Sequence, residues 1–289
     1  MNIEQIRAEY IDHMGDDLMV VNAARTSFGK ESDWDHGETT KVVDEGRNVS
    51  WQHLDKKLKP EDANLIRYLA TGYRAKEWDG LLDKIMMDCF NVATCYETKR
   101  KKLTDLLHAY KRRAQHWAPF AHPHLSLRMQ LPMFLARQFV KHQIGGTWSE
   151  ESRRYISDEP GVWFPDEWHM RPEDVKQGSG GIITHMTWND GGDVEQEEID
   201  PIVRELTSQQ VHAYMQMVKG GAAPEEARIV LPLNTMTTVI WTGSLLFWSR
   251  VCNQRVDSHA QLAAQELGRQ IADIVRPRYP VSWAALCGE

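Results

Sequence analysis

Near the end of the chain, apolar residues recur with the 3.6-residue spacing of an α-helix. The stripe consists of small and branched aliphatic side chains, namely Ala260, Ala263, Ala264, Leu267, Ile271 and Ile274. Asp257-Ser258 can cap this helix, and Pro277 ends it. Residues 203–219 form a second amphipathic pattern that stops at two glycines. Because such stripes must be buried against other elements, the sequence predicts a packed, helix-rich globular domain.

The overall composition is that of an ordinary globular protein. The 289 residues suffice for a large core. With 34 basic against 41 acidic residues, the net charge of −7 argues against a protein that coats nucleic acid. No run of about 18 apolar residues occurs, so we expect no membrane span. The first residues form no secretory signal, and the four cysteines lack CxxC spacing, so we expect a soluble cytoplasmic protein with reduced thiols.

Prolines mark the expected starts of further helices. We expect helices that begin at Pro60, Pro132 and Pro224, the second of them over residues 133–143. The mainly apolar residues 17–24 are predicted to form a strand that runs into a short helix. Two polar stretches, at 29–58 and 156–200, are predicted to be irregular.

Residues 78–113 have a helical pattern and carry two basic clusters, at 99–102 and 111–113. Such clusters can bind nucleic acid or phosphate, or they can form a solvated helix face. Since the chain is acidic overall, we interpret them as a solvated face and expect no nucleic-acid partner.

The first candidate site lies at the end of the predicted 133–143 helix. Gln138, Lys141 and His142 are spaced i, i+3 and i+4, so they share a polar face. Shortly afterwards, residues 149–155 combine a serine hydroxyl, two carboxylates and two guanidinium groups. Guanidinium forks with a hydroxyl can recognise a phosphate monoester, although the same residues could form a salt-bridged surface turn.

Other candidate groups are more isolated. Arg228 and Arg255 lie among apolar residues, where an arginine is expected to have an anionic or carbonyl partner. Imidazoles at His116, His122 and His124 could bind a metal, but no second ligand cluster follows, so we expect hydrogen-bonded histidines and no metal. The sequence contains no GxSxG elbow, GxGxxG loop or P-loop.

Taken together, five blocks of the chain resemble the flavin-dependent thymidylate synthases, the ThyX family. In chain order they are NAARTSF at 22–28, HWAPFAH at 116–122, FLARQ running into KHQ at 134–143, SEESRRY at 149–155, and the stretch from ARIVLPLN at 227–234 through WTGS at 241–244 to RVDSHAQ at 255–261. Their order and separation match the family over most of the chain.

The chain departs from the family's usual motif, R-H-R followed after seven residues by serine. It has Lys141-His142-Gln143 and then eight residues before Ser152. Further substitutions, most of them at positions that face the flavin in the family, are Ala118, Ala121, Ser244 and Arg250. The departures therefore concern flavin binding more than nucleotide binding.

The resemblance implies an α/β (α+β) fold with a central, mainly antiparallel sheet flanked by helices. It implies a single domain over residues 1–289, with an insertion at about 73–113 that has no recognised counterpart in the family. It also implies a homotetramer whose active sites are shared between subunits.

By the same resemblance, the chain is expected to be a methyltransferase that converts dUMP to dTMP by FAD-dependent reductive methylation. The one-carbon donor would be 5,10-methylenetetrahydrofolate, and NADPH would be the reductant. The implied dUMP-binding residues are Gln138, Lys141, Glu150, Ser152, Arg154, Arg228 and Arg255. The implied FAD-binding residues are Ser27, His142, Gln143, Ile144, Arg250 and His259.

Arg255 is the expected catalytic residue, because a fixed guanidinium can stabilise the negative charge that builds on the uracil carbonyls. Two alternatives remain open. The enzyme could methylate or hydroxymethylate another pyrimidine nucleotide such as dCMP, or the chain could be a non-catalytic nucleotide-binding homologue.

Overall fold

The computed structural model describes residues 1–36, 40–44, 49–53, 56–71, 116–172, 178–190 and 193–288. The chain forms two compact units, each assembled from separate segments. Unit 1 contains Met1–Asp12, Leu125–Gly243 and Arg250–Ile274. Unit 2 contains His13–His124, Ser244–Ser249 and Val275–Glu289.

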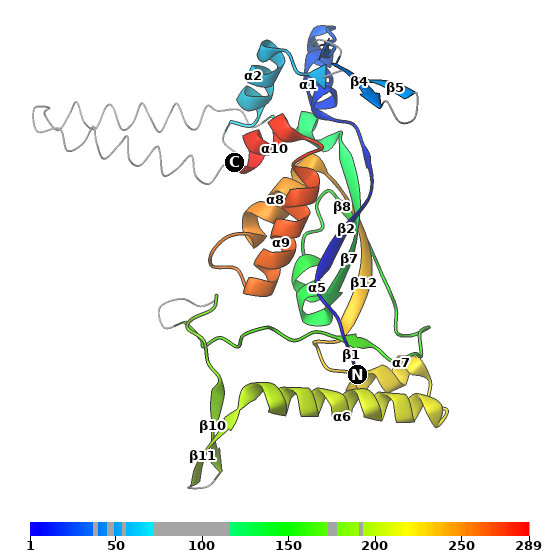
Figure 1. Ribbon diagram of the computed structural model, residues 1–289, viewed down its shortest axis with the longest axis vertical. Helices are drawn as coiled ribbons and strands as arrows, with labels where there is room; N and C mark the ends of the chain where they lie inside the picture. The colour runs from blue at the N-terminus through cyan, green and yellow to red at the C-terminus, as the bar shows by residue number, and fades with distance from the viewer. Residues whose placement is uncertain are drawn as a thin grey trace, which may run out of the picture. The chain divides into compact units, whose positions relative to one another are not determined.

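A four-stranded sheet forms the centre of unit 1. Its strand order is β2 (Arg7–Met14), β7 (His124–Pro132), β12 (Met236–Ser244) and β8 (Gly146–Glu150). Strands β12 and β8 are antiparallel. In β7, buried apolar residues alternate with more exposed ones, the pattern of a strand with one face in the core. Helices α5 (Met133–Phe139) and α9 (Leu262–Val275) lie along one side of this sheet (Figure 1).

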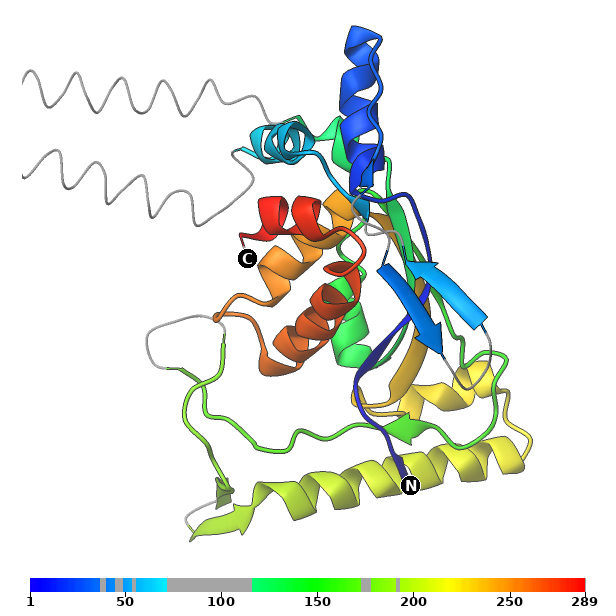
Figure 2. The same ribbon diagram turned by 45° about the horizontal axis from the view of Figure 1, so that its top comes forward.

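The rest of unit 1 includes a long helix, α6 (Ile199–Lys219), shown lengthwise in Figure 2. The antiparallel hairpin of β10 (His185–Asp190) and β11 (Asp193–Glu198) leads into it. After it come α7 (Pro224–Ala227) and the 3-10 turn η3 (Arg228–Val230). Strand β1 (Asn2–Ile3) pairs in parallel with β9 (Gly161–Val162).

Unit 2 is mainly helical. It contains α1 (Asp17–Arg25), η1 (Thr26–Phe28), α2 (Pro60–Leu69), η2 (Ala118–Ala121) and α10 (Pro280–Cys287). Two small antiparallel pairs join β3 (Asp35–His36) with β6 (Lys56–Lys57), and β4 (Thr40–Asp44) with β5 (Val49–His53). Helix α8 (Leu245–Arg255) begins in unit 2 and ends in unit 1.

Two buried aspartates hold the helices of unit 2 together. The Asp17 carboxylate accepts hydrogen bonds from the backbone N–H groups of Val281 and Ser282, at 2.8 and 2.9 Å, and so satisfies two donors in the first turn of α10. The buried Asp62 carboxylate pairs with Arg25 of α1 and accepts a hydrogen bond from the Ser32 hydroxyl. Burial raises the pKa of Asp17, and hydrogen bonds from Ser282 and Val281 oppose that rise.

Several expectations from the sequence are confirmed. The fold is mixed α/β with helices beside antiparallel strands, and α2 begins at Pro60 as predicted. Helix α6 ends at the glycine pair, and the apolar stripe of α9 is buried except at its two ends. None of the helices in the described ranges is both long and apolar enough to cross a membrane.

Other expectations are wrong at the level of local structure. Residues 17–25 are helical throughout and include no strand, because the Asp16 carboxylate caps the helix by accepting the N–H of Met19. The helix expected over 133–143 ends at Phe139, and Gly145 then turns the chain with a φ of 88°. The stretches 29–58 and 156–200 contain short strands in place of purely irregular structure. The proposed insertion at 73–113 lies outside the described residues.

Substituting Asp17 with Asn tests the connection between α1 and α10. Asn keeps one acceptor oxygen but turns the other into an N–H donor that would face a backbone donor. We expect the Asp17→Asn variant to lose about 1–3 kcal/mol of unfolding free energy in urea titrations. The exposed Asp33→Asn is the matched control and should stay within about 0.5 kcal/mol of the wild type. Equal stability of the two variants would contradict a structural role for Asp17.

Candidate functional site

Arg255, the last residue of α8, is held from three sides within unit 1. Its Nε–H donates to His142 Nε2 at 3.0 Å, and its Nη2 donates to the backbone carbonyl of Gln138 at 3.0 Å. The guanidinium carbon also lies 5.3 Å from the centre of the Phe139 ring, within the range of a cation–π contact. The side chain is therefore fixed at the end of α5, where the sequence predicted the candidate site.

The surroundings of His142 and Arg255 lower the pKa of both side chains. Burial lowers the pKa of His142, and the neighbouring Arg255 cation lowers it further. Burial also lowers the pKa of Arg255, which nevertheless remains a cation at neutral pH because guanidinium is so strong a base. The result is a half-buried neutral imidazole that accepts a hydrogen bond from a half-buried cation.

Around Arg255 lies an open cleft with a volume of about 950 Å³, which we call the Arg255 cleft. Gln138 lines it, and its side-chain amide donates to the Gln261 carbonyl oxygen at 2.7 Å. The exposed ammonium of Lys141 also lines it. This cleft thus combines the cations of Arg137, Lys141 and Arg255 with carboxamide groups and the Asp257 carboxylate, and its excess of cations suits an anionic, hydrogen-bonding ligand.

His259 reaches the same cleft from the loop between α8 and α9. The Asp257 carboxylate accepts from both its backbone N–H and its ring Nδ1, at 2.8 and 2.9 Å. These two hydrogen bonds lower the pKa of the Asp257 carboxyl. The buried Gln265 amide donates to the Ala260 carbonyl at 2.9 Å and so ties this loop to α9.

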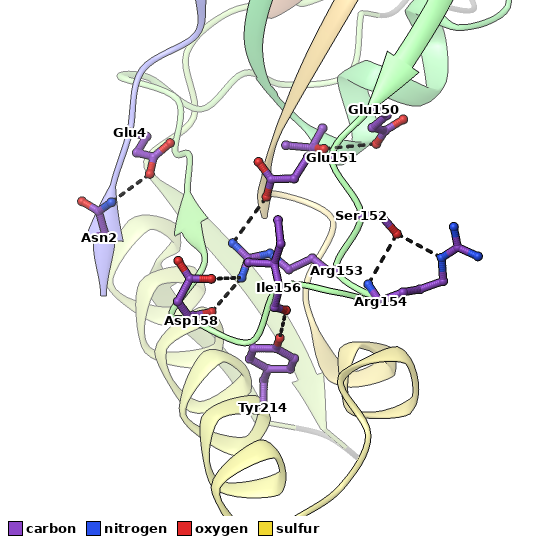
Figure 3. A network of polar contacts seen from close by, with 11 residues as sticks. Asn2, Glu4, Glu150, Glu151, Ser152, Arg153, Arg154, Ile156, Asp158 and Tyr214 are labelled. Carbon is purple, nitrogen blue, oxygen red and sulfur yellow. Dashed lines mark hydrogen bonds and ion pairs between the residues drawn. The ribbon is translucent and has the colours of Figure 1, made fainter.

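A second cleft in unit 1, with a volume of about 1030 Å³, contains the serine and arginine predicted to bind phosphate. We call it the Arg154 cleft. Ser152 Oγ accepts from Arg154 Nε at 3.1 Å, and the Arg154 side chain is exposed (Figure 3). Arg228, which follows α7, lines the same cleft and is also exposed. The Glu150 carboxylate accepts from Trp148 Nε1 at 3.0 Å and Thr237 Oγ1 at 3.2 Å, which fixes it at the end of β8.

The two neighbouring arginines of this segment have different surroundings. In Figure 3 the Arg153 guanidinium lies between Glu151 and Asp158, whereas Arg154 lies beside Ser152. Arg153 is only 13% exposed, and it donates to the Asp158 backbone carbonyl at 2.7 Å. Arg153 is therefore part of a salt-bridged turn, the alternative interpretation of the sequence, while Arg154 is available to a ligand.

Ser27 lies in unit 2, where it lines an open cleft together with Phe28, Lys30 and Trp117. One substituted flavin position, Ala118, lines this cleft, and Ala121 belongs to the same 3-10 turn. We call it the Ser27 cleft. Its exposed aromatic rings and lysine suit a ligand with flat rings and negative charge.

The three remaining predicted flavin residues lie on the surface of unit 1. Ile144 is 82% exposed in the turn after α5, beside the exposed Gln143, and Arg250 is exposed on α8. The substituted position Ser244 is buried, and its hydroxyl accepts the backbone N–H of Phe247 at 3.2 Å at the start of α8. Ser244 therefore acts as a helix cap.

The histidines considered as metal ligands have other surroundings. His124 Nδ1 lies 2.9 Å from the His122 carbonyl oxygen, and the His116 ring lies 5.9 Å from that of Tyr68. Within the described ranges, no group of three or more His, Cys, Asp or Glu side chains is arranged to hold a metal ion.

The structure thus separates the predicted nucleotide-binding residues into two groups. Gln138, Lys141 and Arg255 line one cleft, and Glu150, Ser152, Arg154 and Arg228 line the other. Sequence reasoning missed the roles of Asp257 and Gln261, although both stand in the RVDSHAQ block. Only their contacts with His259 and Gln138 reveal them.

Comparisons with known proteins bear on this arrangement. Residues 82–281 match the family described as "Thymidylate synthase complementing protein". A flavin-dependent thymidylate synthase from Kosmotoga olearia is 32% identical over 170 residues, which are 59% of this chain and 70% of that protein. The enzyme of the same name from Thermus thermophilus is 28% identical over 275 residues, 95% of this chain and 73% of that protein.

The fold is also found in a solved structure. The UMP/dUMP methylase PolB from Streptomyces cacaoi, bound with 5-Br dUMP, superposes with a TM-score of 0.63 at 20% identity. The superposition covers 100% of this chain and 97% of that one, which shows a shared fold. With the family match spanning well over half of its residues, the chain belongs to the flavin-dependent thymidylate synthase family.

Proposed function

We propose that this protein catalyses the FAD-dependent reductive methylation of dUMP to dTMP, with 5,10-methylenetetrahydrofolate as one-carbon donor and NADPH as reductant. The observation that carries the proposal is the gathering of all seven predicted nucleotide residues in two clefts of one compact unit. Family membership supplies the reaction type, and these clefts supply groups for a nucleoside monophosphate.

The Arg154 cleft suits the phosphate end of the nucleotide. Two exposed guanidinium groups, Arg154 and Arg228, can each form charge-assisted hydrogen bonds with phosphate oxygens. The Ser152 hydroxyl already accepts from Arg154, so its proton remains available to an oxygen of the ligand. These contacts with the phosphate, although remote from the reacting pyrimidine ring, would then help to orient that ring.

The Arg255 cleft suits the reacting ring. When C5 of the pyrimidine attacks a one-carbon electrophile, negative charge builds on the ring carbonyl oxygens. The Arg255 guanidinium is held by His142 and the Gln138 carbonyl before the ligand binds, so it need not reorganise as charge develops. Gln138 and Lys141 add donors to the same cleft.

The exposed residues of unit 1 that the resemblance assigns to FAD fit a flavin, which would supply hydride transfer when bound. Ile144 offers an apolar contact for a ring face, while Gln143, Arg250 and His259 offer polar contacts for ring edges and phosphates. His142 can contribute its Nδ1–H, because its Nε2 is already occupied by Arg255. In unit 2, Ser27 and the aromatic lining of its cleft are a separate candidate contact surface for the cofactor.

The division of the nucleotide residues supports a shared active site. Among the described residues, none lines both the Arg154 cleft and the Arg255 cleft. We propose that a single dUMP takes one of these groups from each of two subunits. We propose a homotetramer assembled in this way, which equilibrium sedimentation of the purified protein would test.

The reaction is tested with purified protein, FAD, NADPH and 5,10-methylenetetrahydrofolate, in parallel incubations with dUMP or dCMP. We expect dTMP from dUMP and no product from dCMP, measured by liquid chromatography with mass detection. Product formed from dCMP alone, or a hydroxymethylated product, would overturn the substrate or the reaction. Tight dUMP binding without turnover of either nucleotide would instead indicate a non-catalytic binding protein.

Arginine variants test the assignment of the phosphate end. We expect Arg154→Ala and Arg228→Ala each to lower kcat/KM for dUMP by roughly 10- to 100-fold, because each removes a charge-assisted hydrogen bond. The exposed Arg128→Ala on β7 is the matched control and should retain full activity. If both cleft variants keep wild-type kcat/KM, the phosphate binds elsewhere.

A further inference from the structure

We propose that His142 is a positioning residue for Arg255, and that only its neutral form holds the guanidinium in place. The inference rests on the proposed function for its consequence in catalysis. The contact itself can be tested without any ligand.

The hydrogen bond defines the protonation state of the imidazole. An arginine Nε–H is always a donor, so the 3.0 Å contact requires an unprotonated lone pair on His142 Nε2. His142 is therefore neutral, with its proton on Nδ1. Its ring also lies 6.4 Å from the centres of both the Phe139 and Trp241 rings, so its plane is held by packing.

Among the groups that contact His142, Arg255 is the charged one, and it therefore influences the protonation of the imidazole. From α5 it meets the ring of Phe139, and from β12 the ring of Trp241, neither of which is charged. From α8 it meets the Arg255 cation. The adjacent Lys141 is exposed and lines the Arg255 cleft. Both burial and Arg255 oppose protonation, which keeps the acceptor form dominant at neutral pH.

Protonation would reverse the interaction. An imidazolium presents N–H at Nε2, so the hydrogen bond is lost and two cations face each other. Arg255 would keep its bond to the Gln138 carbonyl and its contact with the Phe139 ring, but with one hydrogen bond in place of two its guanidinium is less firmly oriented. The group that stabilises charge on the pyrimidine would then have to be ordered during the reaction. Activity should therefore fall as pH decreases through the pKa of His142, which lies below the ordinary 6.5.

Two substitutions of His142 test separately whether its role is to accept a hydrogen bond and whether its protonation causes the loss of activity at low pH. Gln can place a carbonyl oxygen near the position of Nε2, and that oxygen does not titrate in this range, whereas Leu offers no acceptor. We expect the pH profile of kcat/KM for dUMP to lose its acid limb in His142→Gln, because the Gln carboxamide does not titrate. His142→Leu should lower kcat/KM by roughly 10- to 100-fold at every pH. The exposed His212→Gln on α6 is the matched control and should keep the wild-type profile.

A measurement on the cofactor-free protein tests the contact directly. NMR titration of the His142 ring should give a pKa below 6.5 in the wild type and a higher value in Arg255→Ala, because the adjacent cation is gone. An unchanged His142 pKa in Arg255→Ala, or an unchanged acid limb in His142→Gln, would overturn the proposal. If instead the pKa shifts as expected but dUMP is not methylated, the pairing stands and the proposed function fails.

Discussion

The hydrogen bond from Arg255 to His142 joins the parts of the structure on which the proposed chemistry depends. It connects the end of α8 to the turn after α5, and the second bond from Arg255 reaches the backbone of α5 itself. An arginine placed by two acceptors and an aromatic ring is already ordered before any ligand arrives. Preorganisation of this kind is what gives a catalytic cation its effect, since no energy is spent on orienting it during the reaction.

The loop between α8 and α9 extends this order to the rest of the cleft. Asp257 holds His259, Gln265 holds the loop backbone, and Gln261 holds Gln138. Each contact is an ordinary hydrogen bond of modest net energy, yet together they fix several polar groups around one cleft. The Lys141 and Gln143 substitutions in the family motif leave this framework unaffected, because neither side chain supplies one of its bonds. His142, the motif residue that is kept, supplies the acceptor for Arg255.

Much of the fold could be predicted from the sequence where the pattern was long and its ends were marked. Helix α6, which ends at the glycine pair, shows this, as does α2 with its initial proline, whereas α9 begins at Leu262 and not directly after the predicted cap Asp257-Ser258. Prediction failed where tertiary contacts or single capping residues decide the outcome. Residues 17–24 are apolar enough for a strand, but Asp16 caps a helix there and Asp17 docks onto α10. The helix after Pro132 ends already at Phe139, and the residues that follow place His142 against Arg255.

For the site, the sequence by itself determined which residue types are present and which family they resemble, because the order and spacing of the motifs can be read directly from the sequence. It could not determine which of the two arginines at 153 and 154 is available, since both have the same charge and nearly the same neighbours. Only the tertiary structure decided this, by placing Asp158 and Glu151 against Arg153 and leaving Arg154 beside Ser152. It likewise decided that His142 is neutral and bound to Arg255, because burial and a hydrogen bond between residues 113 positions apart depend on how the chain packs.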